Sequence, residues 1–141
     1  MLQQVLKTLR LEIPGRGLHD ITDDVRRVLT ESGLRRGLIT LFLRHTSASL
    51  LIQENADATV RADFERFFSR LVPDGDPMFA HDDEGPDDMP AHVRTALTQT
   101  SLGIPFDGSK MVLGTWQGIY VYEHRTRPHT RELVVHALGD R

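Results

Sequence analysis

Cysteine is absent from all 141 residues of the chain. Without thiols the protein has no disulfide framework, no thiolate nucleophile and no cysteine-held metal ion or cluster. Any metal ion must therefore be bound by histidine, aspartate or glutamate. Long apolar runs are also missing, and no stretch approaches the roughly 18 residues that a transmembrane helix needs. The N-terminal segment has neither the charged start nor the unbroken apolar core of a signal peptide, so we expect a cytoplasmic protein without a membrane partner.

A strong charge of either sign is lacking as well. The formal net charge is −3 and charged residues make up 26% of the chain, a balance that gives no general attraction for nucleic acid or a membrane surface. The basic residues are scattered and form no stripe with exposed aromatic side chains, which argues against a nucleic-acid partner. Glycine-rich phosphate loops, His-Glu-x-x-His and Gly-x-Ser-x-Gly are all absent. The length predicts one domain, residues 1–141, around one core.

The first part of the chain combines strand and helix patterns. Loose alternation over residues 3–13 predicts a half-buried strand. Thr22 is a suitable N-cap for a short amphipathic helix over residues 23–32, and Gly33 can end it. Residues 38–43 are nearly all apolar, which predicts a strand covered on both faces.

Two more helices are expected in the middle of the chain. Asn55 or Asp57 can cap the second helix, and its apolar residues at helical spacing predict a core face made of Val60, Phe64, Phe67 and Phe68. Asp88 can cap the third helix, and the same spacing predicts a buried stripe made of Met89, Val93, Ala96 and Leu97.

The C-terminal part is predicted to be β-structure. Residues 101–106 and 110–115 flank a turn and predict a hairpin. Strict alternation over residues 119–124 and the apolar pattern over 133–138 predict two further strands. Together with the helices, this pattern indicates an α+β protein.

The densest charge in the chain lies in residues 81–92, HDDEGPDDMPAH. This segment holds five carboxylates and two histidines, together with two prolines and a glycine that restrict its shape. Carboxylates at such density repel one another unless something neutralises them. A bound metal ion, arginines from elsewhere in the chain, or solvent could do so, and the segment alone does not distinguish them.

A second polar group follows the apolar strand. His45, Thr46, Ser47 and Ser49 come directly after it, with Arg44 beside them. Hydroxyls and a guanidinium at the end of a central strand are suited to phosphate or another oxyanion. The alternative is that the hydroxyls only satisfy backbone groups in a turn.

Four histidines and several carboxylates could form one site. Three neutral imidazoles with an open position are a common zinc geometry, and carboxylates can complete or orient such a site. Carboxylates alone could instead bind magnesium, which in turn holds a diphosphate. The histidines are far apart in sequence, so only the fold can bring them together. The candidates are His45, His81, His92 and His124, with Glu54, Glu84, Asp87, Asp88 and Glu123.

Four long motifs resemble one known family. HTSASLLIQENAD at 45–57, HDDEGPDDMPAH at 81–92, SLGIPF at 101–106 and LGTWQGIYVYEHR at 113–125 are similar to the YjbQ family, which is described as secondary thiamine-phosphate synthase enzymes. The resemblance implies a β-sandwich of two mostly antiparallel sheets with about three helices, and a homotrimer. It also implies a weak thiamine-phosphate synthase activity, which joins a pyrimidine diphosphate to a thiazole phosphate.

From the chemistry and the resemblance together we expect a metal-dependent enzyme that acts on a phosphorylated small molecule. The divalent metal is expected to be zinc, with magnesium or manganese as alternatives, on His45, His81 and His92. The catalytic candidates are Glu84, Asp88, Glu123 and His124. The substrate-binding candidates are Arg44, Thr46, Ser47, Asn55, Gln117 and Arg125. Metal-assisted hydrolysis of a phosphate ester would use the same residues. The alternative is a trimeric binding or sensing protein for an anionic metabolite or a metal, without turnover.

Overall fold

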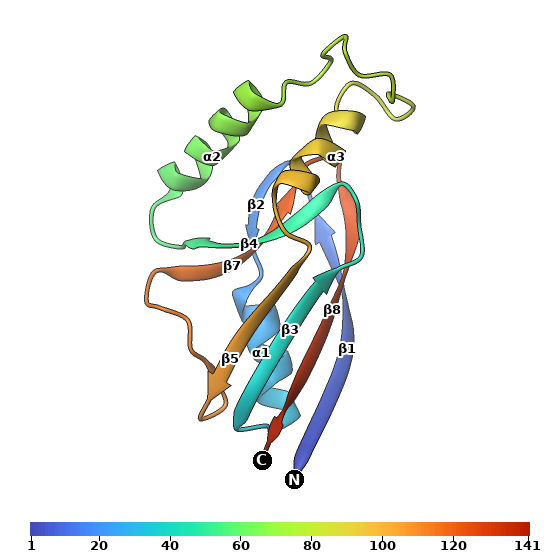
Figure 1. Cartoon of the computed structure of the whole chain (residues 1–141). Helices are drawn as coiled ribbons and strands as arrows, with labels where there is room; N and C mark the ends of the chain where they lie inside the picture. Colours follow the sequence, from blue (N-terminus) through green and yellow to red (C-terminus); the bar gives the residue numbers. More distant parts are fainter.

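Two antiparallel sheets and three helices make up the computed structural model, which describes residues 1–141 (Figure 1). The elements are β1 (Leu2–Ile13), β2 (Gly17–Asp20), α1 (Thr22–Ser32), β3 (Arg36–Leu43), β4 (Ala48–Glu54), α2 (Ala58–Leu71), α3 (Asp88–Leu97), β5 (Ser101–Asp107), β6 (Lys110–Met111), β7 (Gln117–Glu123) and β8 (His129–Asp140). The predicted α+β sandwich is confirmed. None of the three helices has the length and hydropathy of a membrane-spanning segment.

The core lies between the two sheets and helix α1. The larger sheet has the strand order β1-β8-β3-β5-β6, and the smaller one has the order β2-β7-β4. Helix α1 contributes Val25, Val28 and Leu29 to the core, at the helical spacing that its sequence predicts. Strands of both sheets contribute their inward residues to the same cluster. The sandwich therefore buries the inner face of each sheet, and β7 of the smaller sheet is buried on both faces.

Strand β3 differs from its prediction. Ile39, Leu41 and Leu43 are buried, whereas Leu38 and Phe42 are 47% and 48% exposed. The strand therefore alternates between the core and an outer face on which no helix or strand of the chain packs (Figure 1). The prediction of burial on both faces is wrong, because an unbroken apolar run does not show whether a second layer exists.

Helix α1 begins one residue earlier than predicted. Ile21 is at the N-cap position and Thr22 is the first helical residue. Asp20 Oδ1 accepts from the Thr22 backbone N–H at 2.9 Å, and the Thr22 hydroxyl accepts from the Ile119 N–H at 2.9 Å. Thr22 thus joins the helix to β7. Gly33 has φ +72° and ends the helix as predicted.

Helix α2 projects beyond the sandwich (Figure 1), and its predicted core face is confirmed for Phe68 alone. Asp57 caps the helix by accepting from the Thr59 N–H at 2.9 Å, as predicted. Only Phe68 of the helix is buried, while Phe67 is 61% exposed and Phe64 is partly exposed. Phe68 packs edge-on against Tyr122 of β7. One aromatic residue therefore contacts the core, because the helix touches the sandwich along a narrow line.

The predicted buried stripe of helix α3 is only partly confirmed, since Met89 and Val93 are half-buried. Its buried residues are Asp88, Pro90, Ala91 and Arg94, whereas Ala96 is exposed and Leu97 is 57% exposed. Asp87 takes the N-cap position that was predicted for Asp88. Asp88 and Arg94 of this helix point inward because charged side chains of other elements lie beside them.

The C-terminal strands are confirmed with one shortened element. The hairpin forms, but its second strand ends at Met111 instead of Thr115. Residues 112–116 instead form an irregular loop that leads into β7. Strand β8 is longer than expected and pairs with both β1 and β3.

Candidate metal centre

The acidic segment 81–92 is neutralised in more than one way. Arg125 donates from Nε to Asp87 Oδ2 at 3.0 Å and from a terminal nitrogen to Glu84 Oε2 at 2.8 Å. Burial would raise the pKa of Asp87, but the hydrogen bonds from Arg125 and the Thr126 N–H lower it well below its usual range. Asp82 and Asp83 are exposed to solvent. Arginine and water thus account for four of the five carboxylates.

The fifth carboxylate, Asp88, lies between two histidines. Its Oδ2 is 3.2 Å from His81 Nε2, and its Oδ1 is 3.2 Å from His92 Nε2. One ligand atom from each of the three residues lies within 4.8 Å of the other two. Asp88 and His92 are four residues apart on α3, so they share one face of the helix. The loop before the helix brings His81 to the same place.

Hydrogen bonds with backbone groups orient the side chains of this triad. His92 Nδ1 is 2.8 Å from the Thr46 carbonyl oxygen, which can only accept, so Nδ1 carries a hydrogen and Nε2 is the ring nitrogen that faces Asp88. Asp88 Oδ2 also accepts from the Glu84 N–H at 3.1 Å. Burial would raise the pKa of Asp88, but this N–H, the two histidines and Arg125 lower it overall. An ionised carboxylate and a tautomer-locked imidazole are what a divalent cation requires.

The triad is open on one side. The side chain of Asp88 is 4% exposed, while that of His81 is 46% exposed. His81 borders a hollow of about 290 Å³ that also touches Gly75, Phe79 and Pro90. Two imidazoles and a carboxylate with a position facing solvent fit zinc bound by three protein ligands. Manganese and magnesium accept the carboxylate but favour more oxygen ligands.

His45, the third predicted ligand, lies outside the triad. Its Nε2 accepts from the Glu132 backbone N–H at 2.7 Å, and its Nδ1 lies 3.4 Å from a terminal nitrogen of Arg131. Burial lowers the pKa of His45, and the Arg131 charge lowers it further. The backbone therefore holds Nε2 of His45, which keeps this ring away from the triad.

Two predicted catalytic residues are fully buried. Glu123 accepts hydrogen bonds from the His124 and Arg125 backbone N–H groups and from two nitrogens of Arg131. His124 Nε2 is 2.8 Å from Ser49 Oγ, while His124 Nδ1 has no partner in the protein. Burial lowers the pKa of His124 to about 3, and neighbouring arginines add to the effect. Neither residue faces an opening, so the structure gives both a role in holding the sandwich together.

The predicted phosphate-binding turn adjoins the triad. Arg44, His45, Thr46 and Ser47 line an open hollow of about 590 Å³. Ser47 Oγ accepts from Arg131 at 3.1 Å and Arg44 pairs with Glu132 at 3.2 Å, while the Thr46 hydroxyl has no partner. Because the Thr46 carbonyl oxygen also accepts from His92, this turn is joined to the triad. Arg125, by contrast, is 3% exposed and saturated by carboxylates.

Asn55 and Gln117 lie at the far end of the smaller sheet. In the pairing of β4 with β7, Gln117 is opposite Glu54 at one end, and Glu123 is opposite Ala48 at the other. Seven residues of strand span about 20 Å. Asn55 packs beside Gly118, where a Cβ would lie 3.1 Å from the Asn55 Cβ. The structure therefore divides the predicted site into two places.

Two buried arginines, Arg131 and Arg94, were not predicted from the sequence. Arg131 shares the inward face of β8 with Leu133 and Val135, so the alternation of that strand could have revealed a buried arginine. Arg94 is fully buried, donates to Glu65 Oε1 at 2.8 Å and leaves two nitrogens without partners. The helical spacing gave no signal for this, because it predicted burial for Ala96 and Leu97, which are exposed.

Comparisons with known proteins agree with the motifs. The family model for UPF0047 YjbQ-like proteins matches residues 7–140. A UPF0047 protein of Synechocystis is 48% identical over 138 residues, covering 98% of this chain and 94% of the relative. The YjbQ protein of Escherichia coli O157:H7 is 44% identical over 135 residues, covering 95% and 97% of the two chains.

Solved structures match over nearly the whole chain as well. A YjbQ/UPF0047 protein of Clostridium acetobutylicum has a TM-score of 0.84 and 32% identity, covering 93% of this chain and 98% of its own. A YbjQ-like protein of Sulfolobus solfataricus, described as of unknown function, has a TM-score of 0.89 with 21% identity, covering 99% and 100%. The latter shows a shared fold alone. On the family model and the sequence relatives, the chain belongs to the UPF0047 YjbQ-like family.

Proposed function

We propose that His81, Asp88 and His92 bind a divalent metal ion, with zinc as the first candidate and manganese or magnesium as alternatives. The observation that carries this proposal is the 2.8 Å contact between His92 Nδ1 and the Thr46 carbonyl oxygen, which presents the opposite ring nitrogen toward Asp88. Metal-binding histidines commonly donate one ring N–H to a backbone carbonyl in this way, which leaves the other ring nitrogen for the ion. The ligand set differs from the expected one because Asp88 replaces His45.

The protein is proposed to be an enzyme that acts on a phosphorylated small molecule. A bound metal would polarise a phosphate oxygen or activate a water molecule. The Thr46 hydroxyl and the Arg44 guanidinium border the adjoining hollow, where they can hold the remaining phosphate oxygens. Arg125 and Glu84 pair with each other, so we assign them to the support of the acidic loop and not to substrate binding.

The finer activity is proposed from the family resemblance. It suggests a weak thiamine-phosphate synthase reaction, in which a pyrimidine carbon loses diphosphate and the thiazole phosphate nitrogen attacks it. The same resemblance suggests a homotrimer. The partly exposed apolar side chains Leu38, Phe42 and Leu138 on the outer face of the larger sheet support contact with other copies.

A binding or sensing protein is the second candidate. The enclosure of Glu123 and His124 favours it, because two expected proton-transfer groups are removed from the site. Such a protein would bind the metal or an anionic metabolite through the same triad and hollow without turning it over.

The test of the metal site is the metal content of untagged protein, measured beside His81→Ala, Asp88→Asn and His92→Ala. His136→Ala is the matched control, since His136 contacts Gln4 on the larger sheet. We expect about one equivalent of metal per chain in the wild type and the control, and a large loss in the other three. A metal-free wild type that still binds no added zinc would refute the proposal.

Turnover separates the two candidates. Metal-loaded protein is incubated with phosphate esters, with organic diphosphates, and with the pyrimidine diphosphate and thiazole phosphate together. Product formation that disappears in Asp88→Asn supports an enzyme. Stoichiometric binding of such a compound without product supports the binding protein.

A further inference from the structure

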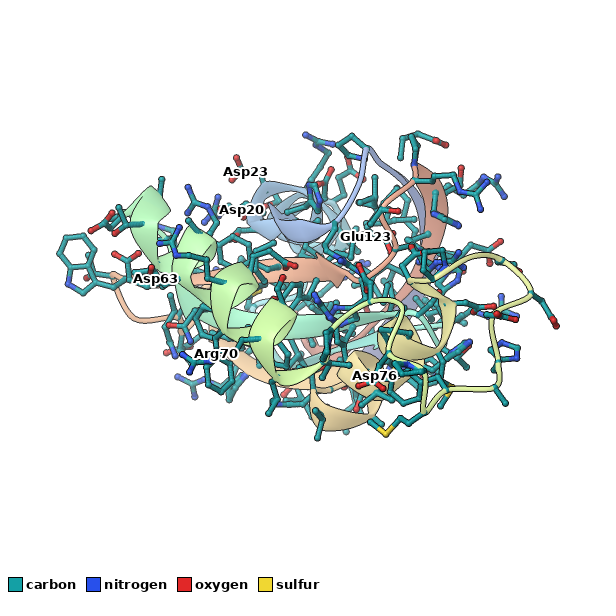
Figure 2. All side chains as sticks on the ribbon, turned by 90° about the horizontal axis from the view of Figure 1, so that it is seen from above. Asp20, Asp23, Asp63, Arg70, Asp76 and Glu123 are labelled. Carbon is teal, nitrogen blue, oxygen red and sulfur yellow. The ribbon has the colours of Figure 1, made fainter.

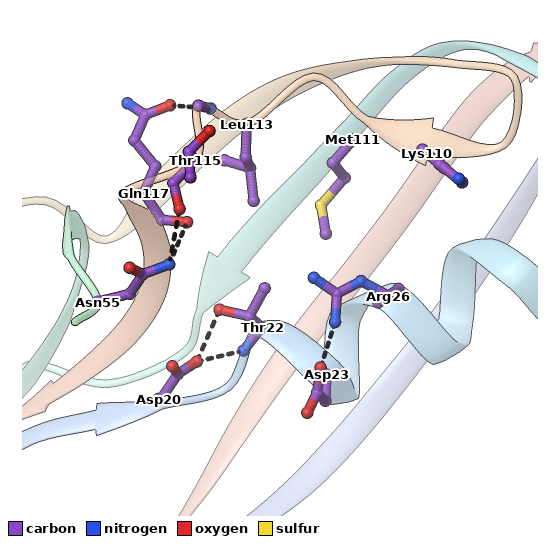
Figure 3. A pocket seen from close by; sticks show the side chains of 11 residues that line it. Asp20, Thr22, Asp23, Arg26, Asn55, Lys110, Met111, Leu113, Thr115 and Gln117 are labelled. Atoms are coloured by element: carbon purple, nitrogen blue, oxygen red, sulfur yellow. Dashed lines mark hydrogen bonds and ion pairs between the residues drawn. The ribbon is translucent and has the colours of Figure 1, made fainter.

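A second cavity lies far from the metal triad, between the start of α1, the loop 112–116 and the β4–β7 end that carries Asn55 (Figure 3). Its volume is about 430 Å³, within the range of small-molecule pockets. It gathers Asn55 and Gln117, the two expected substrate-binding residues that the fold moves away from the histidines. The metal site makes no use of any residue in this cavity.

The two ends of the cavity carry opposite charges, and neither has a charged partner. Asp20 Oδ1 accepts from the Thr22 backbone N–H and hydroxyl, while its Oδ2 accepts from no group of the protein. Lys110 forms no ion pair and no side-chain hydrogen bond. Figure 3 shows Asp20 and Asn55 at one end and Lys110 at the other. The remaining two charges, Asp23 and Arg26, neutralise each other as an ion pair.

Neutral side chains complete the lining of the cavity, amides at its polar end and apolar groups in its middle. Asn55 uses its Nδ2 on the Thr115 and Gln117 carbonyl oxygens, which leaves its Oδ1 free to accept. Gln117 uses its Oε1 on the Gly114 N–H, which leaves its amide nitrogen free to donate. Between the ends, the apolar side chains of Met111 and Leu113 form part of the wall (Figure 3).

We propose that this cavity binds a small zwitterion whose ammonium and acidic groups are separated by a short apolar stem. The ammonium group would donate to Asp20 Oδ2 and Asn55 Oδ1, and the acidic group would accept from Lys110. The stem would pack along Met111 and Leu113. The two acidic and two basic side chains of the lining balance, so a simple anion would face Asp20 uncompensated and a simple cation would face Lys110. The proposal does not depend on a metal at the triad.

Three probes of one skeleton test this charge pattern: 5-aminopentanoate, pentanoate and pentylammonium. The only tryptophan of the chain, Trp116, lies between the lining residues Thr115 and Gln117, so its fluorescence reports binding locally. Isothermal calorimetry measures the same titrations independently of the fluorescence. We expect the zwitterion to bind about tenfold or more tightly than either singly charged probe, since each lost end removes a charged hydrogen bond.

Two variants remove one end each. In Lys110→Met, 5-aminopentanoate should bind no better than pentylammonium; in Asp20→Asn, it should bind no better than pentanoate. Asparagine retains the acceptor that begins α1, so the second variant should stay folded, which circular dichroism checks. Lys7→Met is the matched control, because Lys7 pairs with Glu31 outside the cavity.

The outcomes separate this proposal from the metal site. Retention of the zwitterion preference in His81→Ala, with loss in Lys110→Met, supports a distinct site. Equal binding of pentanoate and 5-aminopentanoate to the wild type would overturn the proposal, and so would no binding of any probe by calorimetry. An unchanged preference in both Lys110→Met and Asp20→Asn would overturn it as well.

Discussion

At one end of β7 Glu123 is fully buried and accepts four hydrogen bonds, whereas at the other end Gln117 is exposed and borders an open cavity. Seen from above in Figure 2, Glu123 lies within the molecule, while Asp20 and Asp23 lie toward one side of it. Charges near Glu123 pair with one another and with Arg125 and Arg131. Around the cavity at the Gln117 end, Asp20 and Lys110 have no charged partner.

The comparison teaches that buried charge and available charge serve different purposes on one short strand. At the Glu123 end the carboxylates form ion pairs with arginines, and these ion pairs position the loop and the helix that carry the triad. The Gln117 end leaves donors and acceptors facing solvent, where a ligand can reach them. A dense set of polar residues therefore becomes a scaffold where it is enclosed and a binding surface where it is open.

Breaking the Glu123–Arg131 pair should have the largest effect. Glu123→Gln leaves Arg131 buried without a counter-charge, and we expect a loss of about 3–5 kcal/mol in the free energy of unfolding. Urea denaturation measures the change. Glu132→Gln is the control, since Glu132 pairs with Arg44 and Arg10 near the surface and should change stability by less than about 1 kcal/mol. Equal losses in both variants would contradict the buried-pair interpretation.

Zinc should stabilise only through the triad. If zinc binds the folded state alone, a concentration one hundred times its dissociation constant adds about 2.7 kcal/mol. Thermal unfolding with and without zinc should show this gain in the wild type and in Asn55→Ala. The gain should vanish in His92→Ala. A zinc effect that survives in His92→Ala would place the ion elsewhere.

Acid should weaken the Glu123 end through His124. The pKa of His124 is about 3 in the folded protein and near 6.5 in the unfolded chain. Between these values only the unfolded chain binds the proton, so stability falls as the pH falls from about 6.5 toward 3, by about 1.4 kcal/mol per pH unit. His124→Gln cannot titrate, and metal-free protein in urea should lose less stability over this range in the variant. Parallel pH profiles would argue against a neutral, buried His124.

The smallest effect is expected at the open end. Asn55→Ala removes two long hydrogen bonds, of 3.3 and 3.4 Å, from an exposed position. Because water can replace them, we expect a loss of less than about 1 kcal/mol and unchanged metal content. Urea denaturation and metal analysis check the two expectations. A loss as large as that of Glu123→Gln would show that the open end is structural too.

Local sequence patterns predicted where the helices and strands lie better than they predicted which of their faces are buried. Alternation, the capping residue Asp57 and the terminating Gly33 identified the helices and most strands, because these signals depend on neighbours in the chain, but β2 and β4 were not predicted. The predicted apolar faces of α2 and α3 are only partly buried, since Phe67 and Leu97 face solvent. An apolar stripe shows that a helix could be buried there, but packing against distant elements decides whether it is.

The residues of the candidate metal site were recognisable from the acidic segment itself. His81, Asp88 and His92 lie within twelve residues, and a loop followed by one helical turn suffices to bring them together. His45, His124, Asn55 and Gln117 come from separate strands. Their positions depend on strand pairing over long sequence distances, and spacing along the chain carries no information about it.

The sequence by itself determined the residue types available for chemistry, the α+β class and, through its long motifs, the family. It excluded thiol chemistry, because no cysteine is present. Only the tertiary structure decided which charges neutralise each other, that Asp88 and not His45 joins the two histidines, and that the amide residues form a second cavity. The physical reason is that the state of a polar group depends on its burial and on partners that the chain brings from far away.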